Sequence, residues 1–439
     1  MQHLFRLISH PKALSQRLLQ RLAFWGAAVL VALAAIVFAK SSEAGGRVFA
    51  ALISDNPLLA FLITPVSFAA VVWLTRTVVP GAEGSGIPQA IAALSIGWAE
   101  RRRVLSLRVA VGKIVLTGLA LCGGASVGRE GPTVQVGVAI MHFFGRWKRL
   151  PHRDMGRRLI LAGGAAGIAA AFNTPLAGIV FAIEELSKSF EEKTSGMVLT
   201  AVILAGFASM ALVGNYNYFG RTAVALELVT AWRPVLLCGV LGGVLGGLFS
   251  RILLAFSRGV PGRPGMLIKA HPVLFAFLCG LGLAAIGQAS NSTVYGTGYQ
   301  EARSLLEGGS ALPANYGLMK FGATILSYIS GLPGGIFAPS LSVGAGLGAT
   351  LSQLAPGTPM AAFIILGMVG YFTGAVQAPL TAVVIVMEMT SDQSMTLPMM
   401  GVAFIAFAVS RLVCPQPLYR TLAQGFLEKS VRHKPAPTS

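Results

Sequence analysis

An unbroken run without Asp, Glu, Lys or Arg, from Phe321 to Met387, restricts this chain more than any other feature. A helix needs about 20 predominantly apolar residues to cross a bilayer, so this run is long enough that it must fold back on itself several times. Two shorter uncharged runs are Leu22–Ala39 and Thr194–Gly220. Only 11% of the 439 residues are charged, against about 25% in soluble domains. The sequence therefore predicts an all-α integral membrane protein.

The formal net charge of +18 is concentrated in a few short segments, which are residues 1–21, 98–108, 146–158, 251–269 and the tail from 413. Nucleic-acid-binding proteins carry basic faces on soluble folds, so this distribution argues against that class of partner. Basic residues gather in cytoplasmic loops, which predicts that all these segments and both termini are cytoplasmic. The helix at 22–39 is expected to be retained, because no small-residue cleavage site precedes Lys40.

The cysteines and histidines do not predict a metal or redox site. All four cysteines lie in apolar segments without spacing that suggests pairing, which is typical of reduced packing residues. Only His142 and His271 lie near apolar runs, and we interpret both as interfacial or packing residues rather than metal ligands. We therefore expect neither a metal ion nor another cofactor.

The chain contains an internal repeat. The segment 173–184, Asn-Thr-Pro-Leu-Ala-Gly-Ile-Val-Phe-Ala-Ile-Glu, aligns with 377–388, Gln-Ala-Pro-Leu-Thr-Ala-Val-Val-Ile-Val-Met-Glu. A second pair, 131–137 and 338–344, matches at nearly the same offset. Two related halves are typical of transporters and channels. The predicted division is a basic N-terminal segment, two membrane halves and a short tail, with bounds 1–21, 22–220, 221–427 and 428–439.

Several segments place glycines just before a proline that opens an apolar run. They are Gly-Ser-Gly-Ile-Pro at 84–88, Gly-Arg-Glu-Gly-Pro at 128–132 and Gly-Gly-Ile-Phe-Ala-Pro at 334–339. Proline is tolerated in the first turn of a helix, so each motif predicts a helix start. A helix start inside a membrane exposes free N–H groups and the positive end of a dipole, which favours anion binding. The alternative, ordinary contacts between small residues, suits 239–243 better.

Ionisable residues within apolar runs are costly and therefore candidates for function. Glu130 lies inside the second motif, where its carboxylate would compete with an anion while charged and release the site on protonation. This predicts a gate that links anion and proton movement. Its neighbour Arg129 either raises anion affinity or makes a structural ion pair. Lys113 either adds positive potential near the pathway or pairs with a buried acid.

Two other glutamates occupy equivalent positions in the repeat. Glu184 and Glu388 each end an apolar run, and the favoured interpretation is structural, as helix caps or paired groups. The alternative class of function is an intramembrane enzyme that uses Ser126 or the Glu184/Glu185 pair. No histidine lies next to Ser126 or next to the glutamate pair in the sequence. We therefore do not expect an enzyme.

The three helix-start motifs, together with Pro-Leu-Tyr at 417–419, resemble those of the CLC family of chloride channels and proton-coupled chloride antiporters. The resemblance covers about residues 25–427. It implies an inverted repeat of tilted and partly re-entrant helices. It also implies a homodimer with one anion pathway per subunit, joined by helices near 175–188, 198–213, 380–390 and 398–412.

The resemblance assigns roles residue by residue. Anion binding is expected from the hydroxyls of Ser85 and Tyr419 and from the backbone around Gly86, Ile87, Ile336 and Phe337. Glu130 matches the gating glutamate. Glu185 matches the internal proton-transfer glutamate of many antiporters. The two acids together favour a proton-coupled chloride antiporter, and the alternative is a passive voltage- or pH-gated chloride channel of the same fold.

Other positions refine this expectation. Ser85 is associated with chloride preference, and Glu130 with Tyr419 argues against the fluoride-exporting branch of the family. Gln89 stands where an acidic residue is common, which changes the local electrostatics. The short stretch after Tyr419, from 420 to 439, leaves no room for a CBS pair, so a bacterial inner-membrane protein is expected.

Overall fold

The computed structural model describes residues 11–147, 153–187, 196–214, 218–220, 226, 228–309 and 312–432. Within these ranges the chain is helical with short connections, and its only β-structure is two isolated bridges. Parts of the predicted basic segments, residues 1–10, 148–152 and 433–439, lie outside the described residues. So do 221–225, which begin the predicted second half.

The helices are numbered along the chain. The first are α2 (Pro11–Ile53), η1 (Pro57–Leu59), α3 (Ala60–Thr77), α4 (Ile87–Ser95), α5 (Trp98–Val104), α6 (Leu107–Cys122), α7 (Glu130–Trp147), α8 (Arg153–Phe172), α9 (Pro175–Phe181), η2 (Ala182–Leu186) and α11 (Gly196–Val213). The later ones are α12 (Leu228–Arg258), α13 (Gly262–Ala270), α14 (Pro272–Ala289), α15 (Tyr299–Leu306), α16 (Tyr316–Ile329), α17 (Phe337–Ser352), α18 (Met360–Val376), α19 (Pro379–Thr390), α20 (Thr396–Val413) and α21 (Leu418–Arg432).

The first helix is longer than its uncharged run predicts. The sequence predicts a helix at 22–39, whereas α2 continues to Ile53 and contains Lys40, Glu43 and Arg47. Glu43, on this extension, accepts from the buried guanidinium of Arg129 at 3.0 Å. One of the extra charges on α2 is therefore compensated by a group far away in the sequence.

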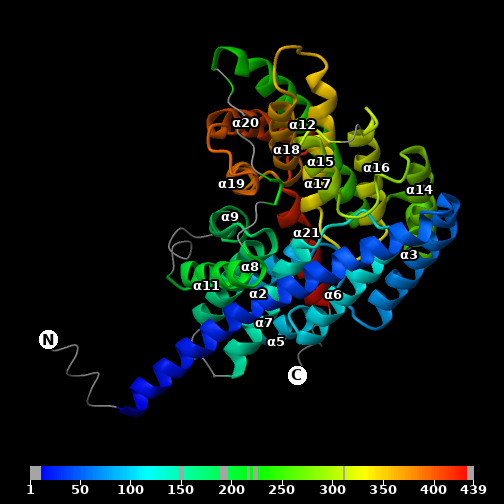
Figure 1. The fold of residues 1–439 in the computed structure, drawn as a ribbon. Coiled ribbons are helices and arrows are strands. Elements are labelled where there is room, and N and C mark those ends of the chain that lie inside the picture. Colours follow the sequence, from blue (N-terminus) through cyan, green and yellow to red (C-terminus); the bar gives the residue numbers. More distant parts are fainter. Residues whose placement is uncertain are drawn as a thin grey trace.

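Helices α2–α11 and α12–α20 gather largely in two parts of the molecule, which meet where α3 packs on α14 and α9 packs on α19, and α21 runs between them (Figure 1). Corresponding packing recurs in both parts: α7 packs on α8, and α17 packs on α18. The long uncharged run forms most of α16 and then α17, α18 and most of α19, which confirms that it folds back several times.

Glycines bring the paired helices into close contact. A β-carbon on Gly137 of α7 would lie 2.4 Å from the carbonyl oxygen of Gly163 on α8, and one on Gly344 of α17 would lie 2.4 Å from that of Gly367 on α18. Only a residue without a side chain permits this approach, as is common between membrane helices. The repeat seen in the sequence is thus also a repeat of helix packing.

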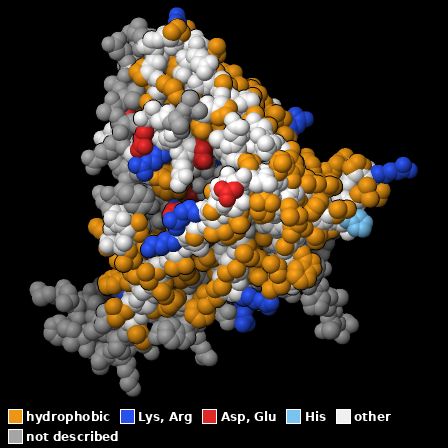
Figure 2. Space-filling model, turned by 45° about the vertical axis from the view of Figure 1, so that its right-hand side comes forward, with side chains coloured by type: hydrophobic (Ala, Val, Ile, Leu, Met, Phe, Trp, Pro, Cys, Tyr) orange, Lys and Arg blue, Asp and Glu red, His pale blue; other side chains and the backbone are white. Residues whose placement is uncertain are grey.

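The described part of the chain contains 7 helices long and apolar enough to cross a membrane. Their outer sides are apolar: Leu62 is 64% exposed, Phe207 68% and Leu412 85%. Figure 2 shows hydrophobic side chains over much of the visible face, especially its lower and right-hand parts, while basic and acidic groups gather around a hollow on its left side and at the margins. Such a surface requires hydrocarbon rather than water, so the predicted integral membrane protein is confirmed.

Candidate functional site

The three predicted helix starts meet in one place. The Gly84 N–H donates to the Leu332 carbonyl at 3.2 Å, and the Gly334 N–H donates to the Gly84 carbonyl at 3.1 Å. Gly128 and Gly335 exchange two hydrogen bonds, each of 2.7 Å. Loops from the two halves of the sequence are thereby joined through their backbones, and α4, α7 and α17 all begin at this junction.

Glycine is required at the junction for two reasons. Gly84 and Gly86 have φ angles of 63° and 89°, in the left-handed region that other residues adopt only with strain. A β-carbon on Gly131 would lie 2.9 Å from the carbonyl oxygen of Ser85. The motifs therefore provide close backbone packing as well as free N–H groups at the helix starts.

Glu130, the first residue of α7, is fully buried at this junction. Its Oε2 accepts a hydrogen bond from the Ala338 N–H at 3.4 Å, and its Oε1 has no partner. Ala338 is the second residue of α17. The carboxyl group thus lies at the positive end of the α17 dipole, where a mobile anion would also bind.

Two hydroxyl groups from opposite ends of the sequence lie together nearby. Ser85 is 1% exposed and Tyr419 is 0% exposed, and neither hydroxyl oxygen has a hydrogen-bond partner of normal geometry. The Tyr419 hydroxyl lies close to Ser85, and the Tyr328 hydroxyl also faces Ser85. Buried polar groups normally have partners, so these free hydroxyls indicate a place for a ligand or ordered water.

The start of α17 forms the other side of this space. Ile336, its N-cap residue, and Phe337 are both buried. The ring centroid of Phe337 lies 6.0 Å from that of Tyr419 and 4.8 Å from that of Phe372. The predicted anion-binding residues Ser85, Gly86, Ile87, Ile336, Phe337 and Tyr419 therefore belong to elements that converge here.

Glu185 lies in the short π-helical turn η2, a type of distortion common at functional sites. Its side chain is 5% exposed, and its Oε1 has no hydrogen-bond partner. Tyr419 lies near enough to interact electrostatically with both Glu130 and Glu185. Arg420, which the sequence did not single out, lies near Glu185 and donates to the Glu184 carbonyl at 3.2 Å.

The charge of Lys113 is directed at backbone carbonyl oxygens. Its buried Nζ donates to the carbonyl oxygens of Ala82, Glu83 and Gly84, at 2.6, 3.2 and 2.7 Å. These carbonyls belong to the loop that leads into α4. The lysine therefore fixes this loop directly. Its two predicted roles, positive potential near the pathway and pairing with a buried acid, stay predictions.

A second lysine that the sequence analysis missed makes the same arrangement in the other half. Lys320 donates to the carbonyls of Val294, Tyr295 and Gly296 at 2.8, 3.5 and 2.8 Å. The loop that it holds continues into α15 through Gly296 and Gly298, which have φ angles of 68° and 78°. Lys320 follows Lys113 at the same offset that separates Pro339 from Pro132, and this offset was the available signal.

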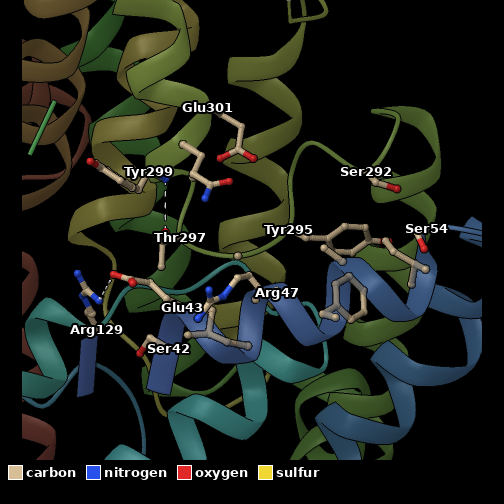
Figure 3. A pocket seen from close by; sticks show the side chains of 18 of the residues that line it. Ser42, Glu43, Arg47, Ser54, Arg129, Ser292, Tyr295, Thr297, Tyr299 and Glu301 are labelled. Carbon is tan, nitrogen blue, oxygen red and sulfur yellow. Dashed lines mark hydrogen bonds and ion pairs between the residues drawn. The ribbon is translucent and has the colours of Figure 1, made fainter. Parts of the chain in front are cut away.

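Arg129 makes the structural ion pair that was one of its two predicted roles. Its Nη1 binds Glu43 at 3.0 Å, and its Nη2 lies 3.5 Å from the Tyr218 hydroxyl. The pair borders a cavity of about 600 Å³ between α2 and the loop 292–301. Figure 3 shows Arg129, Glu43 and Arg47 on the side of this cavity opposite Glu301. The cavity thus reaches the residue next to Glu130.

Glu184 and Glu388 cap each other's helices. The Glu184 carboxylate accepts the N–H groups of Leu380 and Thr381 at 3.1 and 2.7 Å, at the start of α19. The Glu388 carboxylate accepts those of Leu176 and Ala177 at 3.1 and 2.7 Å, at the start of α9. The predicted capping is confirmed, and each cap joins one half of the repeat to the other.

Removing either cap should weaken the contact between the halves. We expect Glu184→Gln and Glu388→Gln each to lower the free energy of unfolding by about 1–2 kcal/mol, because a charged acceptor is lost at a helix N-terminus. The measurement is thermal unfolding of the purified protein, with Glu307→Gln as the control for an exposed glutamate. Equal stability of all three variants would exclude the structural role.

Comparison with known proteins agrees with this geometry. A family model described as "Voltage gated chloride channel" matches residues 67–411, which is most of the chain. The chain belongs to this family, the CLC family. It is therefore a multi-pass membrane transport protein, and the predicted fold class is confirmed.

Solved structures of CLC proteins extend the match over almost the whole chain. A slow cyanobacterial Cl⁻/H⁺ antiporter is 26% identical, with a TM-score of 0.76, and the alignment covers 93% of this chain and 98% of that one. A CLC-type fluoride/proton antiporter is 24% identical, with a TM-score of 0.75, and the coverage is 91% and 98%. A eukaryotic CLC transporter is 20% identical, with a TM-score of 0.73, and the coverage is 93% and 75%.

Proposed function

We propose that this CLC protein is a proton-coupled chloride antiporter. The observation that carries the proposal is the position of Glu130, whose carboxyl group lies at the N-terminus of α17 and accepts the Ala338 N–H. A carboxylate in an anion site competes with chloride while ionised. Protonation removes its charge and frees the N–H groups, so chloride and proton occupy the site in alternation.

Chloride binding is assigned to the space between the helix starts and α21. In this proposal the free hydroxyls of Ser85 and Tyr419 donate to chloride, and the backbone around Gly86, Ile87, Ile336 and Phe337 supplies N–H groups. The apolar rings around Phe337 exclude water, which strengthens each of these interactions. Lys113 and Arg129 act indirectly, by holding the loops from which α4 and α7 start.

The proton is assigned a second site at Glu185. Its carboxyl group is buried and has a free oxygen, and Tyr419 lies within electrostatic reach of both acids. A passive channel needs no second acid of this kind. The solved structure of 26% identity, which is named as a Cl⁻/H⁺ antiporter, further favours coupled transport over the channel alternative.

The proposal extends to assembly and location. Membership of the CLC family supports a homodimer, joined by the helices that the resemblance names. Both termini are placed on the cytoplasmic side of the membrane, following the distribution of basic residues. We propose transport without a cofactor and without catalysis, because the chain belongs to a family of transport proteins.

Antiport is tested with purified protein in sealed vesicles that carry a chloride gradient and no initial pH gradient. Chloride flowing down its gradient is expected to drive protons the opposite way, and a pH-sensitive dye outside the vesicles records them. Dissipating the pH gradient with a protonophore is the control for coupling. Brisk chloride flux without any proton movement would overturn antiport and establish the channel alternative.

A further inference from the structure

The short helix α13 is confined to the membrane surface by its neighbours. It lies in the connection 259–271, between the spans Ala231–Arg258 and Pro272–Ala289. Because a spanning helix begins or ends on each side of it, α13 has no room to move far from the boundary between membrane and water. Its own contacts with the rest of the described chain are confined chiefly to α14.

The outer surface of α13 is apolar where it leaves the protein. Gly265 is its buried residue, and a β-carbon there would overlap the carbonyl oxygen of Val260. This close contact packs the helix against the residues that lead into it. Met266 and Leu267, the next two residues, remain 65% and 63% exposed, and no described element covers them.

Basic residues surround this apolar pair. The segment 251–269 contains no acidic residue and carries Arg251, Arg258, Arg263 and Lys269. Arg263 and Lys269 lie on α13 itself, are exposed, and form no ion pair with another described residue. A surface helix that combines exposed apolar residues with unpaired basic ones has the chemistry of an interfacial anchor on anionic lipid.

We propose that α13 is a membrane-surface anchor that binds anionic phospholipid headgroups. Met266 and Leu267 enter the acyl-chain boundary, and Arg263 and Lys269 contact the headgroup phosphates. Charge complementarity selects anionic over zwitterionic lipid. The apolar pair selects a lipid over a free phosphate ion, because an isolated phosphate would leave both side chains in water. This site is independent of chloride and proton transport.

The test measures which lipid stays with the purified protein. The full chain is reconstituted in mixed phosphatidylcholine and phosphatidylglycerol, extracted in mild detergent, and the retained lipid is quantified by mass spectrometry. We expect phosphatidylglycerol to be enriched. The double variant Arg263→Gln/Lys269→Gln should lower that enrichment at least fivefold, since one basic residue near an anionic surface contributes roughly that factor. Arg303→Gln, which removes an exposed charge on α15, is the matched control and should retain the enrichment.

A second variant separates the lipid from a free anion. Met266→Ser/Leu267→Ser keeps every charge and is expected to lower lipid retention as well, while added inorganic phosphate should not displace the lipid. Unchanged enrichment in the charge variant would overturn the proposal. A second result would also overturn it: inorganic phosphate displaces the lipid, and the serine variant retains as much lipid as the native protein. That result would assign the site to a free anion.

Discussion

Replacing Glu130 by alanine is expected to abolish proton movement while chloride movement continues. The carboxyl group is fully buried and accepts the Ala338 N–H at the start of α17. Alanine removes both the proton carrier and the competitor for the anion site. Proton flux in chloride-loaded vesicles should fall to background, and the chloride rate should be at least that of the native protein.

The control is another glutamate substitution of equal size. Glu307 is exposed and forms an ion pair with Arg303 at 2.8 Å, within one helix turn. Such a pair contributes about 0.5 kcal/mol or less, so Glu307→Ala should leave both fluxes unchanged. Retained proton coupling in Glu130→Ala would remove Glu130 from the mechanism, whatever happens to chloride.

The helix starts could be predicted because they depend on local chemistry. Glycine before proline is informative at any depth in a fold. The glycines permit a positive φ angle at 84 and 86 and close contacts at the other two motifs, and proline lacks an N–H to satisfy. The structure starts α4 at Ile87 and α17 at Phe337, next to Pro88 and close to Pro339. The apolar runs are also a local property of the sequence, so they were sufficient to predict a membrane protein.

The partners of the buried charges could not be predicted, because they depend on tertiary contacts. Arg129 and Glu43 are 86 residues apart, and nothing in the sequence around Arg129 points to α2. The Lys113 carbonyl contacts likewise required the path of the loop before α4. Lys320 was a different kind of omission, since the repeat offset already found in the prolines leads to it from Lys113.

Reciprocal capping by Glu184 and Glu388 lies between these cases. The repeat placed both acids at equivalent helix ends, which was sufficient to predict caps. The sequence did not show that each acid caps the other half's helix. That result requires α9 and α19 to pack together, and the contact is a consequence of the pseudo-symmetric assembly of the two halves.

Replacing Lys113 by methionine is expected to have the second large effect. Methionine preserves much of the buried volume but leaves the carbonyls of Ala82, Glu83 and Gly84 without their donor. Each unsatisfied buried acceptor costs about 1–3 kcal/mol. We therefore expect the free energy of unfolding to fall by about 3 kcal/mol or more, measured by thermal unfolding in detergent.

Lys320→Met is the matched variant, since it removes the same three-carbonyl contact from the other half. Lys320→Met should lower the free energy of unfolding by a similar amount. The loop that Lys320 holds, however, leads into α15 beside the cavity, whereas the loop held by Lys113 leads into α4 at Ser85. Chloride affinity, measured by calorimetry, is therefore expected to fall at least tenfold in Lys113→Met and much less in Lys320→Met. Equal losses of affinity would mean that the lysines act only on overall stability. A larger loss in Lys113→Met would show that the lysine supports the anion site in addition to overall stability.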